Sequence, residues 1–124
     1  MTHAGKHYRV CGLRLSPTPV QRPRIPVWVG GDWRVGGVRR RVTRWDGCYP
    51  MNVTTAEDVR AVLALVERER GSSAGFDVGV ARAQGIRHLC SLAEAGATWC
   101  NEWIPPADLE ATRRALRRGP LRVG

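Results

Sequence analysis

Four short apolar segments alternate with four helix-like segments along this 124-residue chain, and this alternation limits the possible folds more than any other feature. The apolar segments lie near residues 25–30, 46–50, 76–80 and 97–101. Strands that alternate with helices pair in parallel, because each helix crosses over the sheet between two consecutive strands. The order βαβαβαβα therefore predicts an α/β fold with four parallel strands and helices on the outer side. A small open sheet and half of a closed (β/α)8 barrel both satisfy this order.

The helix-like segments are recognised by apolar positions that recur every three or four residues. Thr54 and Glu57 have the spacing of a capping box at the start of the second helix, and Gly71 is suited to end it. The apolar stripes of the four helices are Val35, Val38, Val42 and Trp45 in the first, Val59, Leu63 and Val66 in the second, Ile86, Leu89, Cys90 and Ala93 in the third, and Leu109, Thr112 and Leu116 in the fourth.

Residues 1–24 differ in character from the rest of the chain. Pro17, Pro19 and Pro23 each lack a backbone N–H and have a fixed φ, which disfavours a helix or a central strand. The sequence therefore predicts an irregular, proline-rich arm over residues 1–24, followed by a (βα)4 unit over residues 25–124.

Positive charge is concentrated at the N-terminal end. The net charge is +9; residues 1–44 contain ten Lys or Arg and one acid, whereas residues 45–124 contain ten Arg and ten acids. Such asymmetry fits a nucleic-acid partner or an acidic partner surface. The sequence has no aromatic stacking array and no recognition-helix motif, which argues against nucleic acid.

The sequence offers little for a membrane or a metal. It has no apolar run near the roughly 18 residues of a membrane span, and residues 1–6 lack the apolar region of a secretory signal. We therefore expect a cytoplasmic protein without a membrane partner. No C-x-x-C pair and no Cys–His spacing typical of a metal site occurs, so we expect reduced, buried cysteines and no metal, with zinc or disulfides as the minor alternative. The four cysteines are Cys11, Cys48, Cys90 and Cys100.

Five stretches, in order along nearly the whole chain, carry a resemblance to a known family. They are Gly5-Lys6-His7-Tyr8, the run from Pro17 to Gly31, Arg44-Trp45-Asp46-Gly47, Phe76-Asp77-Val78, and Ala95-Gly96-Ala97-Thr98-Trp99 with Glu102 three residues on. In these stretches the chain resembles the C-terminal half of the luciferase-like flavin-dependent monooxygenases.

The resemblance implies a (β/α)8 barrel that uses reduced flavin (FMN) or a deazaflavin coenzyme to incorporate or reduce O2 at a small organic substrate. The four strands would be the fifth to eighth of that barrel, and no residues correspond to the first four. We therefore expect a truncated oxidoreductase that is inactive alone, and whether the chain is an enzyme at all stays open. The alternatives are a basic half-barrel that serves as an interaction module and a non-functional gene fragment.

The candidate cofactor site follows the first apolar segment. Gly30 and Gly31 would let backbone N–H groups approach a flavin phosphate, the next helix would point its positive end at the same place, and Arg34 could add a charged contact. By its place after the fourth strand, Glu102 could accept a hydrogen bond from the flavin, and Trp99 is expected to be a wall or core residue. The sequence assigns no catalytic residue. Plain βα-turn glycines are the simpler alternative.

Two further expectations concern the parts of a barrel that this chain lacks. The family has a longer loop after its seventh strand, whereas residues 81–85 run almost directly into the next helix. A half-barrel has open edges and an open core face, so we expect Val27, Val29, Val78 and Val80, or their neighbours, to face solvent unless another half covers them. The predicted partners are accordingly a second copy in a homo-oligomer or a missing half-barrel.

Overall fold

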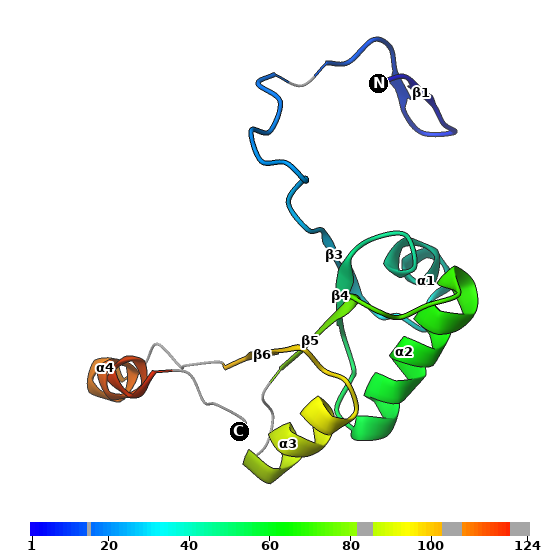
Figure 1. Cartoon of the computed structure of the whole chain (residues 1–124). Coiled ribbons are helices and arrows are strands. Elements are labelled where there is room, and N and C mark those ends of the chain that lie inside the picture. The colour runs from blue at the N-terminus through cyan, green and yellow to red at the C-terminus, as the bar shows by residue number, and fades with distance from the viewer. Residues whose placement is uncertain (15, 82–85, 103–107, 120–124) are drawn as a thin grey trace.

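In the computed structural model, four parallel strands form one sheet, and the helices that connect these strands cover one of its faces (Figure 1). The structure describes residues 1–14, 16–81, 86–102 and 108–119. In chain order the elements are β1 (His3–Ala4), β2 (Arg9–Val10), β3 (Trp28–Gly31), α1 (Gly36–Val42), β4 (Gly47–Pro50), α2 (Ala56–Arg70), β5 (Asp77–Ala81), α3 (Ile86–Glu94), β6 (Trp99–Asn101) and α4 (Leu109–Arg118).

The sheet confirms the predicted strands and their parallel pairing. Its order is β3-β4-β5-β6, so each strand lies beside the next one in the sequence. Consecutive parallel strands joined by a helix on one face are the arrangement that open α/β sheets and βα-barrels share. The order alone does not distinguish the two.

The N-terminal arm is not irregular throughout, which corrects the prediction for residues 1–24. β1 and β2 pair in an antiparallel hairpin, and the Met1 ammonium donates to the carbonyl of Leu13 at 2.7 Å. The prolines that disfavour regular structure lie after this hairpin. Residues 16–27 then lead to β3 without helix or strand, and the hairpin lies well away from the sheet (Figure 1).

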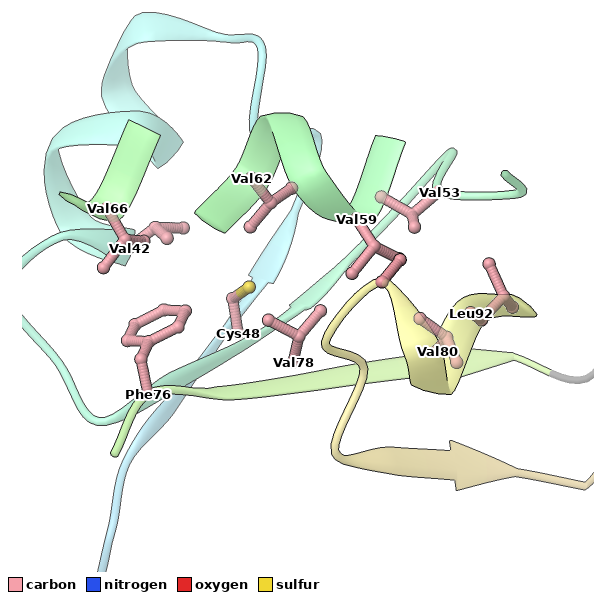
Figure 2. Packing of buried hydrophobic residues seen from close by; sticks show 11 residues of the cluster. Val42, Cys48, Val53, Val59, Val62, Val66, Phe76, Val78, Val80 and Leu92 are labelled. Atoms are coloured by element: carbon pink, nitrogen blue, oxygen red, sulfur yellow. The ribbon is translucent and has the colours of Figure 1, made fainter. Parts of the chain in front are cut away.

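The core lies between the sheet and the helices (Figure 2). Val59 and Val62 point from α2 toward Cys48 of β4 and Val78 of β5, and all four side chains have no exposed surface. Burial of each such side chain contributes about 1.5–3 kcal/mol. The apolar periodicity of α2 thus supplies the helix side of the core, and the β-branched strand residues supply the sheet side.

The open core face is formed by neighbours of the strand valines, and not by Val29, Val78 and Val80 themselves. Val78 and Val80 are 0% and 1% exposed, because they point toward α2 and α3. Val29 also packs against the core, whereas Val27 is 37% exposed. Since strand side chains alternate between faces, the face opposite the helices is carried by the residues between these valines.

The start of α2 lies one residue later than its sequence motif predicts. Thr55, not Thr54, is the N-cap; its hydroxyl oxygen accepts the Asp58 N–H at 3.1 Å, and the Asp58 carboxylate accepts the Thr55 N–H at 3.0 Å. This reciprocal pair is a capping box formed with Asp in place of Glu. Gly71 ends the helix at φ +79°, as predicted.

The last helix, α4, has an apolar stripe that remains exposed to solvent. Leu109 and Leu116 are 61% and 66% exposed, and none of the described residues of α4 is buried. Asp108 caps the helix by accepting the Ala111 N–H at 2.9 Å. Across the described residues, no helix has the length and apolar character needed to cross a membrane.

Candidate functional site

Three aromatic side chains occupy the sheet face opposite the helices, here called the open face. Trp28 of β3 and Trp99 of β6 meet edge to face, with ring centroids 5.7 Å apart and an interplanar angle of 65°. Tyr49 of β4 leans toward β5, because a Cβ atom at Gly79 would lie 2.8 Å from its Cδ2 atom. The open face is therefore an apolar, aromatic surface.

Two glycines make room for these rings. A Cβ atom at Gly47 would lie 2.8 Å from Cδ1 of Trp28, and one at Gly79 would lie 3.1 Å from Cζ3 of the same ring. The indole of Trp28 thus extends from the edge strand across β4 to β5. Contacts this close exclude any side chain larger than glycine unless the rings move, so the glycines and the aromatic cluster depend on each other.

Polar groups gather where β3 and β4 end. The Asp32 carboxylate accepts the Arg34 backbone N–H at 3.0 Å, the Arg34 Nε–H at 3.1 Å and the Asn52 side-chain amide at 3.3 Å. Hydrogen bonds from Arg34 lower the pKa of Asp32 below its usual range, with a smaller contribution from Asn52. Asn52 has the left-handed φ of 63° that places its amide over this carboxylate. The sequence analysis missed Asp32 and Asn52, although each closely follows a predicted strand.

The two candidate glycines have different surroundings. Gly31 has φ +131°, and a Cβ atom there would lie 3.1 Å from Cγ2 of Val38. Its lack of a side chain therefore lets α1 pack on β3. The nearest atom to a Cβ at Gly30 is the Tyr49 carbonyl oxygen at 4.0 Å. The backbone at Gly30 is open to an approaching ligand, so of the two it is the better candidate for a close contact.

The structure brings together only some of the predicted site residues. Gly30, Gly31 and Arg34 lie around the end of β3, whereas Glu102 follows β6 at the opposite edge of the sheet. Three interstrand spacings place these edges on the order of 14 Å apart along the sheet. Glu102 also forms an ion pair with Arg118 at 3.0 Å. It lies at the same C-terminal rim of the sheet but not in the Gly30 cluster.

Asp46 connects the arm to the sheet. Its carboxylate accepts two hydrogen bonds from the Arg24 guanidinium, at 2.6 and 3.1 Å, and the Val27 N–H at 2.7 Å. The Arg24 guanidinium, helped by the Val27 N–H, lowers the pKa of this carboxyl. Arg24 also lies over the Trp45 ring at 5.2 Å. Asp46 therefore has a structural role in fixing where β3 begins.

Among the described residues no cysteine forms a disulfide, but only some of the cysteines are buried. Burial raises the pKa of the Cys48 thiol to about 12, whereas Cys11 and Cys100 are exposed, which corrects the expectation for these two. Cys11 lies in the arm and Cys100 on the edge strand β6, where little packs against them. Within the described ranges, no group of three or more His, Cys, Asp or Glu side chains is placed to hold a metal ion.

Comparison with known proteins yields no relative: the chain matches no family model, no curated protein and no solved structure. The predicted short loop before α3 includes residues 82–85, which lie outside the described residues.

Proposed function

We propose that this chain is the C-terminal half of a luciferase-like (β/α)8 barrel, a flavin-dependent oxidoreductase acting on a small organic substrate. The single observation that carries the proposal is the gathering of Gly30, Asp32, Arg34 and Asn52 at the C-terminal rim of parallel strands. Ligands of βα-barrels bind at this rim, across loops that follow the strands. The sequence resemblance adds the kind of ligand, FMN or a deazaflavin coenzyme.

The residues at the rim suit an anionic, aromatic cofactor. Gly30 leaves room for a phosphate where a side chain would stand, and the Arg34 guanidinium, 54% exposed, keeps terminal N–H groups available although Asp32 holds its Nε–H. Asp32 offsets part of the Arg34 charge, so backbone N–H groups would provide much of the phosphate contact. The bound flavin would supply the redox chemistry, and this chain would bind it, orient it and help to exclude water.

Four βα units provide only half of the loops that surround a barrel's active site. Glu102 contributes from the far edge of the same rim, and the gap between the edges β6 and β3 would have to be closed by four further units. We therefore expect the chain alone to show no flavin-dependent turnover. Binding of the cofactor phosphate is the part of the function that this half can retain.

A basic interaction module is the second candidate, because arginines gather on α1. Arg39, Arg40 and Arg44 line a surface groove together with Thr43 and Glu69. Only part of this charge is compensated, by the Arg39–Glu69 ion pair at 3.0 Å. An acidic partner surface would find complementary charge there, and such binding would weaken steeply with salt.

A fluorescence titration of the chain with FMN and with a deazaflavin coenzyme tests the first proposal. Gly30→Val should weaken binding at least tenfold, because its side chain would occupy the open space beside the backbone. Gly37→Val is the matched control, since a Cβ there meets nothing within 4 Å. Gly31→Val is unsuitable, because it would disturb the packing of Val38. No binding by the unmodified chain, or equal affinity in both variants, would contradict the proposal.

A further inference from the structure

The open face has the pattern of a barrel interior. In register across the sheet, Trp28 lies beside Gly47 and Tyr49 beside Gly30, and Trp99 lies beside Gly79. Closed βα-barrels fill their interior with layers of side chains from alternate strands, so a large residue needs a small neighbour. On a solvent-facing sheet, glycine at these positions would only weaken the strands. The alternation of large aromatic side chains with glycines therefore points to a closed barrel.

The two ends of the sheet are complementary to each other. A helix that follows a strand packs toward the next parallel strand, but α4 follows the edge strand β6, and its Leu109 and Leu116 remain exposed. At the other edge, the segment before β3 runs away from the sheet (Figure 1), and Ile25 and Val27 are exposed. The apolar stripe of α4 thus has no strand to pack on, and the apolar residues that lead into β3 have no helix to cover them.

From this complementarity we infer that the open face and both sheet edges bind a second copy of this chain, two copies closing one eight-stranded barrel. A two-fold axis along the barrel would pair β6 of each copy in parallel with β3 of the other. The α4 helix of each copy would then cover Ile25 and Val27 of its partner. The inference rests on the half-barrel geometry of the proposed function but not on flavin binding.

The charge of the sheet does not oppose this contact. Asp77 is the charged side chain that the described strands place on the open face, and it accepts a hydrogen bond from the Thr98 hydroxyl at 3.0 Å. The α4 helix, in contrast, brings four arginines to the contact. Two of them form ion pairs within the chain, Arg113 with Glu110 at 2.7 Å and Arg118 with Glu102 at 3.0 Å.

The size of the contact shows which parts of it are needed. A face four strands wide and four residues long measures on the order of 250 Å², whereas stable interfaces bury about 800 Å² per partner. The sheet face alone is too small, so both strand edges and the α4 stripe must contribute. Disturbing either an edge or α4 should therefore dissociate the dimer.

The backbone of β3 shows how its edge can be blocked. The Val27 and Gly31 carbonyls accept hydrogen bonds from Asp46 and Met51, so these alternate residues face β4. The backbone groups of Trp28 and Gly30 accordingly point to the free edge, because alternate residues of a strand bond to opposite sides. Gly30→Pro would remove an outward N–H without breaking the β3–β4 pairing, since proline is tolerated on edge strands.

Sedimentation velocity of the purified chain, from about 1 to 100 μM, tests the inference. The unmodified chain should sediment as a single species with twice its mass of 13.7 kDa. Leu116→Glu should weaken the dimer at least tenfold, because burying an unpaired charge costs more than the 1.4 kcal/mol that tenfold represents. Gly30→Pro should weaken it likewise, and far-UV circular dichroism should show that both variants remain folded.

Arg114→Glu is the matched control, because it places the same side chain on α4 away from the Leu109–Leu116 stripe. It should leave the dimer unchanged. A folded monomer across the concentration range would overturn the inference and leave the open face to another chain, and open-ended oligomers would overturn it as well. These readouts do not involve flavin, so a dimer that binds no flavin would contradict only the proposed function.

Discussion

The indole rings of Trp28 and Trp99 are in contact, with centroids 5.7 Å apart, although their strands β3 and β6 are the two opposite edges of the sheet. The contact is possible because Gly47 and Gly79 leave the intervening strands without side chains under the Trp28 ring. Trp28 therefore connects all four strands on the open face.

The first prediction concerns this aromatic cluster. Gly79→Ala should lower the free energy of unfolding by about 1–3 kcal/mol, the usual cost of overpacking, because its Cβ would lie 2.8 Å from Tyr49 and 3.1 Å from Trp28. Urea unfolding followed by tryptophan fluorescence measures the loss. Gly37→Ala is the control: its Cβ meets nothing within 4 Å, and alanine favours a helix. A variant at Gly79 as stable as the Gly37 variant would show that the rings are not packed on that glycine.

The second prediction distinguishes the N-cap of α2 seen in the structure from the one its sequence motif predicts. Thr55→Ala should cost about 0.5–2 kcal/mol of stability, because it removes the hydroxyl that accepts the Asp58 N–H. Thr54→Ala should cost much less, since Thr54 provides its backbone N–H to Asp58, which alanine keeps. Urea unfolding of both variants at pH 7 gives the comparison, and a larger loss at Thr54 would restore the original assignment.

The strands and helices could be predicted from the sequence because each has a strong local pattern. The β-branched runs in β3 and β5 and the capped, periodic α2 need no distant partner to be recognised. The cap of α2 was misplaced by one residue because Thr54 and Thr55 both fit a capping motif, with Glu57 and Asp58 as the respective partners. Local spacing cannot distinguish two such overlapping motifs.

The candidate site was less predictable, because it depends on which face each strand presents. Either the valines of β5 or their neighbours were expected on the open face, because a shift of one residue sends every side chain to the other side of a sheet. That choice is made by packing against α2 and α3, which sequence spacing does not reveal. Asp32 and Asn52 lie 20 residues apart, and only the parallel register of β3 and β4 brings them together.

The third prediction concerns acid stability. Hydrogen bonds from the Thr54 N–H and the Thr55 side chain lower the pKa of Asp58, and the Arg24 guanidinium lowers that of Asp46. A carboxyl whose pKa is lower in the folded state stabilises the protein above its unfolded pKa of about 3.9. This stability is lost as pH falls through the folded pKa, because protons bind the unfolded chain more strongly. The free energy of unfolding should therefore be smaller at pH 3 than at pH 6.

Asp58→Asn and Asp46→Asn test the assignment of this effect, because each replaces the carboxylate with a neutral group of similar size. Each variant should show a smaller difference between pH 6 and pH 3 than the unmodified chain. The two reductions should add, since the residues belong to separate hydrogen-bond groups. An unchanged difference in both variants would place the acid sensitivity in other carboxyls.

The last prediction uses the cysteines as reporters of burial. At pH 8 a thiol reagent should modify Cys11 and Cys100 in the folded chain, because both are exposed. Cys48 should react only after unfolding, since it has no exposed surface and its pKa is raised to about 12, which leaves almost no thiolate. Peptide mass spectrometry over time gives the three rates, and rapid modification of Cys48 without denaturant would show that the sheet–helix core is open.

The same reaction also reports on association. Cys100 lies on the edge strand β6, so its modification rate should fall with rising protein concentration if two copies join there. The modification rate of Cys11, which lies in the arm, should stay constant.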